Sequence, residues 1–529
     1  MGVLEEKKEI VNLFLDNGFL TSNNFINSFT NKKQEEKDEI NKTIKKIKYD
    51  SVVVINNNFL TILNKDKPFS ILEYNRLSVL NEKNKELKII KEFIKSISKK
   101  EENDKKEEKQ KGLKIIFSYE EESKKRTYND FVSYFRSRYE QIKNMLINRQ
   151  ELNNILSINK ILAKKDKEAV SIIAMVTEKR ETKNSNIILT VEDLTGSIKV
   201  LINKNKSELY KEAKDICLDE VIGIQGVNGN NIIFSNNILW PDIPFQKEFK
   251  KSPNEAYALF TSDMELGSNY FLKDSFNNFI KWINLEIGNE EQKEIASKVK
   301  YLFITGDLVE GVGIYPNQEK DLNIPDIYEQ YKEFANYIKK IPKHIKIIIC
   351  PGNHDAMRIA EPQPPLYKDF AKPIYDLPNT LMVSSPSYVN IHANETFSGF
   401  DILMYHGYSL IPYSENVDSI RTAGGQERVD LTMKYLLKRR HLAPTHQSTL
   451  SLPTPEKDHL VIDKIPDFFV TGHIHRAMTA IYRNITLINA SAWTGIMPNQ
   501  EKRGLKPQPA RVVVVNLQTR KIKIMNFEE

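Results

Sequence analysis

Apolar and polar positions follow different periods in successive parts of this chain. Between residues 128 and 149, apolar side chains recur every three or four positions, which predicts an amphipathic helix. Between residues 165 and 247, short β-branched runs are separated by polar turns, a pattern typical of strands. From residue 248 onward apolar runs alternate with amphipathic stretches, which indicates an α/β domain, and residues 511–525 are expected to close it as a hairpin.

The strand-rich part, residues 165–247, is expected to form a five-stranded barrel. Four apolar runs are plain in the sequence, at residues 170–176, 186–191, 197–202 and 221–227, and a helical stretch near residues 209–217 separates the third from the fourth. This layout is that of an OB-fold. OB-folds often bind single strands on aromatic platforms. These strands carry almost no aromatic side chains, so we interpret the barrel as a packing element.

The segments ahead of the barrel differ in composition. Residues 1–75 mix short apolar runs with polar breaks and are interpreted as a protein-interaction module, with a helix near residues 10–15 and a hairpin over residues 51–63. Residues 76–125 are expected to be a charged linker. The reason is that residues 99–112 are almost all charged and cannot offset their ordering entropy by burial.

The predicted helix belongs to a helical connector, residues 126–164. Arg136, Arg138 and Arg149 accompany its apolar stripe, and such a helix could lie on nucleic acid. We favour a stripe that faces a protein core while the arginines point to solvent, because that is the ordinary arrangement of an amphipathic helix.

Composition and charge narrow the possible partners only slightly. The net charge of +7 fits a nucleic-acid partner and fits equally a lysine-rich surface without one. The sequence begins without the apolar core of a signal peptide, and no apolar run approaches the roughly 20 residues of a membrane helix. We therefore expect a cytoplasmic protein with no membrane partner.

Cysteine and histidine usage limits the metal chemistry. Two cysteines, Cys217 and Cys350, cannot form a four-cysteine zinc site or a disulfide framework. Any metal ion must therefore be held by His, Asp, Glu or Asn side chains. All nine histidines lie between His344 and His475, so the candidate chemistry belongs to the last domain, residues 248–529.

Five apolar runs in this domain are each followed by side chains that can bind metals. The runs and the residues after them are 257–262 before Asp263 and Glu265, 299–305 before Asp307, 347–350 before Asn353, His354 and Asp355, 402–405 before His406, and 468–471 before His473 and His475. Open α/β sheets place ligands at the carboxyl ends of their strands, so these side chains are expected to meet. A glycine before Asp307, Asn353 and His473 suits close backbone approach at such an edge.

The combined set offers oxygen and nitrogen ligands without thiolate, which suits manganese, iron or zinc. Alternation along His473-Ile474-His475 could direct both imidazoles to one side, one for each of two ions. Two ions roughly 3.5–4 Å apart activate a water and neutralise the charge on a phosphate. The implied reaction is phosphoester hydrolysis.

The order of these motifs resembles a known superfamily. Asp-x-(His), Gly-Asp, Gly-Asn-His-Asp, His-Gly and Gly-His-x-His follow one another as in the calcineurin-like metallophosphoesterases. The resemblance implies an α/β multidomain fold in which a β-sandwich flanked by helices holds a dinuclear site. It implies these ligands: Asp307 bridging both ions, Asp263 and His475 on one ion, and Asn353, His406 and His473 on the other. It also implies that His354 faces the scissile phosphate as general acid or charge stabiliser, oriented by Asp355.

One position departs from the superfamily pattern, because Glu265 stands where the first motif has a histidine. Glutamate can ligate manganese or iron, but it adds negative charge where a neutral imidazole is expected. We include Glu265 among the expected metal ligands. We expect activity to survive, because the other motif positions are intact.

Two further segments resemble a narrower family. Residues 311–318, Gly-Val-Gly-Ile-Tyr-Pro-Asn-Gln, and residues 358–364, Arg-Ile-Ala-Glu-Pro-Gln-Pro, are similar to signatures of the small subunits of archaeal family-D DNA polymerases, and the likeness covers roughly residues 115–529. It implies a 3′→5′ proofreading exonuclease with two divalent ions, manganese being favoured and iron or zinc the alternatives. It further implies a large catalytic polymerase subunit as heterodimeric partner, the single-stranded 3′ end of DNA as substrate, and a nucleoid-associated place in the cytoplasm.

Two other functions stay open at this point. A catalytically weakened scaffold subunit could bridge the polymerase to other replication factors, although the retained histidines argue against it. Another phosphatase or cyclic-nucleotide phosphodiesterase of the superfamily would share the ion-binding motifs, which do not specify the leaving group.

Overall fold

The computed structural model describes residues 19–21, 53–55, 112–120, 124–502 and 504–528 of the chain. The chain divides into two compact units, Met1–Asp104 and Lys105–Glu529. In the first unit, strand β1 (Phe19–Thr21) pairs in parallel with β2 (Val53–Ile55). The helix expected near residues 10–15, and residues 59–63 of the expected hairpin, lie outside the described residues.

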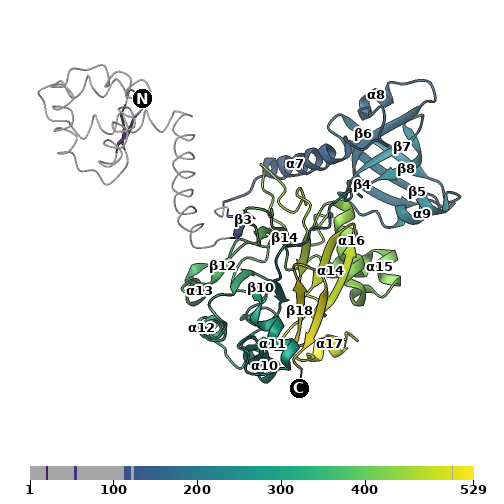
Figure 1. Cartoon of the computed structure of the whole chain (residues 1–529). Helices are drawn as coiled ribbons and strands as arrows, with labels where there is room; N and C mark the ends of the chain where they lie inside the picture. Colours follow the sequence, from purple (N-terminus) through teal and green to yellow (C-terminus); the bar gives the residue numbers. More distant parts are fainter. Residues whose placement is uncertain (1–18, 22–52, 56–111, 121–123, 503, 529) are drawn as a thin grey trace, which may run out of the picture. The chain divides into compact units, whose positions relative to one another are not determined.

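The second unit contains two six-stranded sheets and a closed barrel (Figure 1). The first sheet has the order β12 (Thr380–Met382), β11 (Lys346–Cys350), β10 (Val299–Thr305), β9 (Tyr257–Thr261), β18 (Arg511–Asn516) and β19 (Ile522–Asn526). Strands β9 to β12 pair in parallel, while β18 runs antiparallel to both β9 and β19. The predicted C-terminal hairpin is confirmed.

The second sheet has the order β16 (Met478–Tyr482), β17 (Ile485–Asn489), β15 (Phe468–Thr471), β14 (Phe400–Met404), β13 (Ser387–Ile391) and β3 (Leu113–Ser118). Its edge strand β3 falls within the segment that we expected to be a charged linker. That expectation was wrong for residues 113–118, which pair antiparallel with β13. The charged run ends at Gly112, and the apolar residues after it can bury Leu113 in the core.

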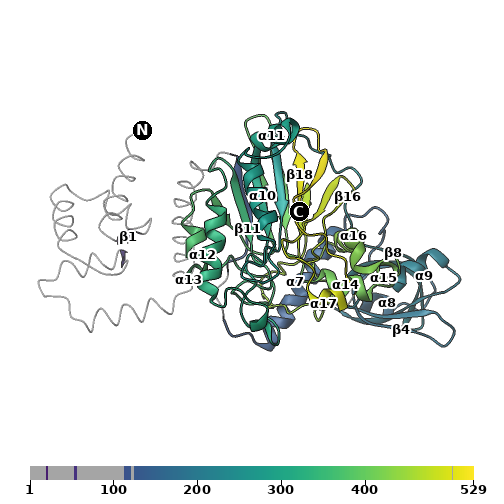
Figure 2. The same ribbon diagram turned by 90° about the horizontal axis from the view of Figure 1, so that it is seen from below.

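The two sheets pack face to face, and helices cover their outer faces (Figure 2). Phe260, Phe303 and Ile348 of the first sheet share one apolar core with Ile402 and Phe468 of the second. The helices over the first sheet are α10 (Lys273–Ile283), α11 (Glu290–Ser297), α12 (Ile327–Ile338) and α13 (Lys368–Tyr375). Those over the second are α14 (Leu410–Asn416), α15 (Asp418–Thr422) and α16 (Val429–Arg439). The second unit is thus a mixed α/β structure.

The barrel has five strands, as the sequence predicted. In the order of their pairing they are β4 (Ala169–Glu181), β5 (Ile187–Asp193), β6 (Gly196–Ile202), β8 (Ile232–Leu239) and β7 (Val221–Gly229). Helix α9 (Ser207–Lys214) lies between the third and fourth strands of the sequence, and α8 (Ile158–Leu162) packs on the same apolar core. The fifth strand, β8, was less plain in the sequence because Ser235, Asn236 and Asn237 interrupt its apolar pattern.

The predicted connector helix is α7 (Tyr128–Leu146), which lies between the barrel and the sheets (Figure 1). Tyr139 and Ile142 pack with Met175 of the barrel and with Val461 of the last domain. The helix therefore faces protein cores, as we favoured.

The expectation that its arginines point to solvent was wrong for Arg138, whose exposed fraction is 1%. The Arg138 guanidinium donates to Oδ2 of Asp458 at 2.7 Å and to the carbonyl oxygen of Pro444 at 2.6 Å. Arg149 is half-buried and donates to the carbonyl oxygen of Trp240 at 3.2 Å, whereas Arg136 is exposed. A buried arginine is tolerated here because a carboxylate and a carbonyl satisfy its donors.

Candidate metal centre

The loops after β9, β10, β11, β14 and β15 bring the expected site residues to one edge of the sandwich. Three of these strands belong to the first sheet and two to the second, so the site forms only when both sheets are packed. The side chains that meet there fall into three groups whose candidate ligand atoms all lie within 4.8 Å of one another in each group.

The first group contains Asp307, His406 and His473. Nε2 of His406 lies 3.2 Å from Oδ2 of Asp307 and 2.9 Å from Oδ1 of Asn353. Nδ1 of His406 lies 2.7 Å from the carbonyl oxygen of Thr305. Because that oxygen can only accept, Nδ1 carries the proton, and Nε2 is the nitrogen turned toward the group.

The second group contains Asp263, Glu265 and His475. Nε2 of His475 lies 3.1 Å from Oε1 of Glu265 and 3.5 Å from Oδ1 of Asp263. Glu265 is 1% exposed, so it takes the inward position beside Asp263 that the sequence pattern assigns to a ligand. The imidazoles of His473 and His475 lie in different groups, in keeping with the alternation in their segment.

The third group contains Glu265, His354 and a residue that sequence reasoning missed, Glu310. Nδ1 of His354 lies 3.0 Å from the carbonyl oxygen of Glu310, which leaves Nε2 as the free ring nitrogen. The Glu310 side chain is fully buried, and Gln318 and Tyr315 donate hydrogen bonds to its Oε1, each at 3.1 Å. An acidic residue three positions after Asp307, in an otherwise apolar stretch, was the available signal.

Asp355 does not orient the His354 ring, contrary to what the resemblance implied. Its Oδ2 accepts from the backbone amide of Gly352 at 2.9 Å, and its Oδ1 accepts from the hydroxyl of Tyr331 at 3.1 Å. The side chain turns back beneath the loop that carries it. Asp355 therefore holds the loop after β11 in place, and the carbonyl of Glu310 orients His354 instead.

Several pKa values in the site are displaced by burial and by charged neighbours. Burial would raise the pKa of Asp307, but His406 and His354 hold it well below its usual range. Burial would lower the pKa of His406, yet Asp307 raises it to about 10. For Glu310, burial and the neighbouring Glu265 both act upward and raise the pKa to about 7.

The donor set fits divalent cations. Oε2 of Glu265 and Oε2 of Glu310 are buried, and neither atom has a hydrogen-bond partner among the described residues. A buried carboxylate oxygen without a donor is costly unless a cation compensates it. With Asp263, Asp307 and the four imidazoles of the groups alongside, these oxygens form a mixed set of the kind that holds manganese, iron or zinc.

The backbone at this edge is strained where the candidate ligands sit. Five of them have positive φ values: Asp263 at 48°, Glu265 at 44°, Asp307 at 50°, His473 at 68° and His475 at 53°. Non-glycine residues adopt this region at a cost, and such strain gathers at functional sites. The surrounding sandwich thus holds these side chains in positions that relaxed backbone would not give.

The glycine before Asp307 is required, as the sequence predicted. Gly306 has φ of +91°, and a Cβ there would lie 2.5 Å from Nδ1 of His406. At Gly352 a Cβ would strike the carboxylate of Asp307, and at Gly472 it would strike the hydroxyl of Ser262. These loops can approach one another only because three of their positions lack side chains.

A cavity of about 490 Å³ opens over the site. Glu265, Asp307, His354, His473 and His475 line its floor, and Tyr270, Tyr315, Asn317 and Lys320 are among the residues of its outer wall. A cavity of about 600 Å³ meets it at His473. We call them the His354 cavity and the Tyr408 cavity, after a residue that lines each.

Among the described residues, no helix is both long enough and apolar enough to cross a membrane.

The known proteins whose sequences match this chain are subunits of DNA polymerases. A family model for the B subunits of DNA polymerases alpha and epsilon matches residues 258–479. The DNA polymerase II small subunit of Pyrococcus furiosus is 38% identical over 400 residues, which cover 75% of this chain and 63% of that protein. The one from Methanothermobacter thermautotrophicus is 38% identical over 387 residues, which cover 73% of this chain and 77% of that protein.

The one from Methanocaldococcus jannaschii is 39% identical over 393 residues, which cover 74% of this chain and 64% of that protein. The chain thus spans slightly less than two thirds of the length of some of these relatives. Among solved structures, asparaginyl-tRNA synthetase from Pyrococcus horikoshii aligns with 16% of this chain and 21% of its own at 16% identity and a TM-score of 0.15, which supports no argument.

Proposed function

This chain belongs to the family of archaeal DNA polymerase II small subunits, and from that premise we propose that it is the metal-dependent 3′→5′ proofreading exonuclease of a DNA polymerase. The observation that carries the proposal is the meeting of two ligand groups, Asp307–His406–His473 and Asp263–Glu265–His475, beneath one open cavity. The positive φ values of five of these residues support a catalytic site, because strained backbone gathers at active sites and ligand clamps.

In this proposal the sandwich is of the calcineurin-like kind, the barrel is an OB-fold, and the site holds two divalent cations. Manganese is the favoured metal, with iron or zinc as alternatives. Asp307 is the candidate bridge that the motif order implies: its Oδ2 faces His406, and its carbonyl oxygen accepts from the amide of Glu265, in the other group, at 3.0 Å. Bound there, the cations would supply an activated water and charge neutralisation for the phosphate.

His354 is the proposed general acid. Its Nδ1 is held by the carbonyl of Glu310, so a proton on Nε2 is available to the cavity. In a 3′→5′ exonuclease the leaving atom is the 3′ oxygen of the penultimate nucleotide, and that oxygen takes the proton as the phosphorus–oxygen bond breaks. Gln318 and Tyr315, from the segment that resembled the polymerase family, hold Glu310 and so fix His354 indirectly.

The partners follow as part of the same proposal. The chain would pair with a large catalytic polymerase subunit and act on the single-stranded 3′ end of DNA. Co-purification of a tagged chain with a large polymerase subunit tests the pairing.

The decisive test of the exonuclease is His354→Ala. We expect it to slow degradation of a 5′-labelled single strand in Mn²⁺ by about 10²–10⁴-fold, the usual contribution of a general acid. Equal degradation by the wild type and the variant would show that the activity is contaminating, and would favour the scaffold function. Comparing a 3′-mismatched primer with a simple aryl phosphate monoester separates an exonuclease from a phosphatase.

A further inference from the structure

The Tyr408 cavity has uncharged walls. Its lining includes Tyr408, Ile411 and Leu450 on the apolar side and Ser448, Thr449 and Ser451 on the hydroxyl side. None of the described residues that line it is a lysine, arginine, aspartate or glutamate. With about 600 Å³ it has the size of ordinary small-molecule sites, and its walls suit a flat, uncharged group rather than a phosphate.

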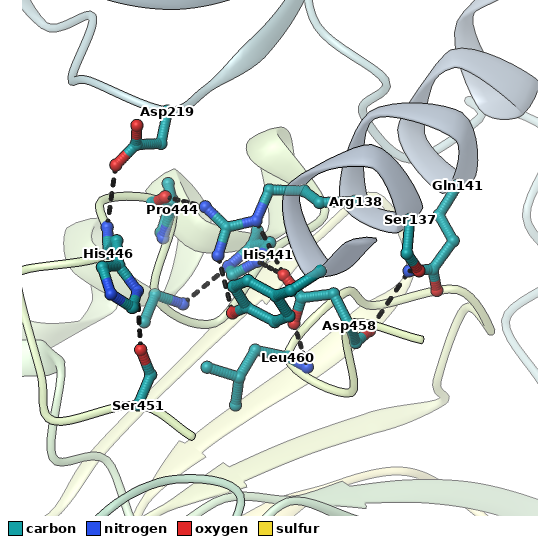
Figure 3. A network of polar contacts seen from close by, with 12 residues as sticks. Ser137, Arg138, Gln141, Asp219, His441, Pro444, His446, Ser451, Asp458 and Leu460 are labelled. Carbon is teal, nitrogen blue, oxygen red and sulfur yellow. Dashed lines mark hydrogen bonds and ion pairs between the residues drawn. The ribbon is translucent and has the colours of Figure 1, made fainter. Parts of the chain in front are cut away.

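One wall of this cavity, residues 446–451, is held in place by a network of polar contacts (Figure 3). The backbone amide of His446 donates to Oδ2 of Asp219 in the barrel at 3.0 Å, and Nδ1 of His446 lies 2.8 Å from the hydroxyl of Ser451. Just ahead of the wall, the carbonyl of Pro444 accepts from Arg138 of helix α7. The wall is therefore preformed by contacts from two other parts of the chain, the barrel and helix α7, and by a hydrogen bond within the wall.

The same network fixes the far end of the wall segment. Oδ2 of Asp458 accepts from Arg138 at 2.7 Å and lies 2.9 Å from Nε2 of His441. All three side chains are buried, with exposed fractions of 0–1%. The segment from 441 to 458 is thus tied down at both ends (Figure 3). Residues 446–451 within it line the cavity.

The proposed reaction decides which side of the scissile bond lies in which cavity. The leaving 3′ oxygen must lie within reach of His354, which lines the His354 cavity and not the Tyr408 cavity. The upstream strand is attached to that oxygen, so it belongs in the His354 cavity, where Lys320 can meet a backbone phosphate. The terminal nucleoside hangs from the same phosphorus through its 5′ oxygen and must leave the site in another direction.

We propose that the Tyr408 cavity is the subsite for the 3′-terminal nucleoside, the unit that the exonuclease releases. This rests on the proposed exonuclease function and adds where each side of the scissile bond binds. The cavity reaches the metal centre at His473, whose ring makes an edge contact with Tyr408 at 5.7 Å between centroids. Tyr408 offers a stacking surface for a base, and the serine and threonine hydroxyls offer hydrogen bonds to its edge or to the sugar.

Two esters with the same leaving group test this assignment. Thymidine 5′-(4-nitrophenyl phosphate) carries the terminal nucleoside, whereas methyl 4-nitrophenyl phosphate carries only a methyl group in its place. In both, water adds to phosphorus, the bond to the aryl oxygen breaks, and 4-nitrophenolate leaves. With Mn²⁺ we expect the wild type to show a kcat/KM for the thymidine ester about tenfold or more above that for the methyl ester, the worth of one stacked base.

The blocking variant is Leu450→Trp, with Leu194→Trp as its matched control. Leu450 is 60% exposed at the cavity, and Leu194 is 57% exposed on the β5–β6 turn of the barrel, so neither substitution disturbs a core. We expect Leu450→Trp to lower the ratio of kcat/KM for the thymidine ester to kcat/KM for the methyl ester by about tenfold, because the indole fills the space of the base. Leu194→Trp should leave both rates and their ratio unchanged. Gln447→Trp, another exposed position of the cavity, provides a second blocking variant if the first melts at a lower temperature than the control.

The outcomes distinguish a failure of the proposed nucleoside subsite from a failure of the proposed exonuclease function. An unchanged preference in both blocking variants overturns the subsite, whether or not absolute rates fall. Slower oligonucleotide degradation with an undiminished thymidine preference also overturns it, and would place the upstream strand in the Tyr408 cavity. If the wild type hydrolyses neither ester nor an oligonucleotide, the exonuclease function itself has failed.

Discussion

Glu265 is the residue at which this chain departs most clearly from its motif pattern, and the structure places it in two of the three ligand groups. One of its oxygens faces His475, and the other is buried without a hydrogen-bond partner among the described residues. Burial would raise the pKa of Glu265, but His475 beside it lowers it, so the side chain is an anion in its site. A glutamate in this position can bind an ion as a histidine would, and it adds a negative charge that a neutral imidazole lacks.

Glu265→Gln tests that role. It keeps the shape of the side chain but removes the charge, so we expect one of two Mn²⁺ ions to bind about tenfold or more weakly, as usually follows the loss of a ligand or its support. Equilibrium dialysis with elemental analysis gives the stoichiometry, and Glu319→Gln, at an exposed carboxylate, is the control. Two ions bound with unchanged affinity in Glu265→Gln would contradict the assignment of Glu265 as a ligand.

At the scale of elements, helix α7 is held by a buried ion pair as well as by apolar packing. Arg138 and Asp458 are 320 positions apart in sequence, yet their side chains meet at 2.7 Å with almost no exposure. Removing one partner of such a pair leaves the other charge buried and unpaired. The amphipathic period of the helix was readable from sequence, but the identity of its buried arginine was not, because the partner arrives from another domain.

Arg138→Met should therefore lower the free energy of unfolding by about 3–5 kcal/mol, since it strands Asp458. Urea denaturation followed by tryptophan fluorescence measures the loss. Arg136→Met, two positions away on the exposed side of the same helix, should leave stability nearly unchanged. Equal effects of the two substitutions would show that the ion pair contributes nothing particular.

The same pair predicts a pH dependence of stability. Burial would raise the pKa of Asp458, but Arg138 and His441 hold it well below its usual range. A carboxyl with a depressed pKa stabilises the fold fully above its unfolded value of about 3.9, and the contribution is lost as the pH falls toward the folded value. The stability difference between wild type and Asp458→Asn should thus be constant from neutral pH to about pH 5 and shrink below about pH 4. A difference that stays constant in acid would contradict this.

At the scale of the whole molecule, the second sheet is completed from outside the domain that holds the site. Strand β3 pairs with β13 at its edge, Leu113 enters the core between the sheets, and the amide of Tyr119 donates to Ser384 at 2.7 Å. These contacts span more than 260 positions in sequence. The domain boundary suggested by charge alone would have cut this strand away.

Two truncations test the contribution of β3. Removal of residues 1–104 leaves the second unit intact and should not change its melting temperature. Removal of residues 1–125 also deletes β3, unburies the partners of Leu113 and Tyr119, and exposes an edge strand, so we expect a lower melting temperature and aggregation. Differential scanning fluorimetry with light scattering distinguishes the two; identical behaviour would show that β3 is dispensable.

Sequence by itself determined the parts of this protein that depend on local pattern. The period of α7, the strand runs, the barrel and the polar loops after five strands are all visible, because each arises from residues close together in the chain. The need for glycine at Gly306, Gly352 and Gly472 was readable too, since motif order placed each beside a candidate ligand.

Tertiary structure alone decided the contacts between distant segments. It brought Glu310 to His354, turned Asp355 away from it, buried Arg138 against Asp458, and added β3 to the second sheet. It also formed the Tyr408 cavity, whose walls come from the segment after β14 with helix α14, the segment after α16 and the loop after β15. Such features depend on which surfaces come into contact when two sheets, a helix and a barrel pack together. The periodic pattern within one segment does not specify those contacts.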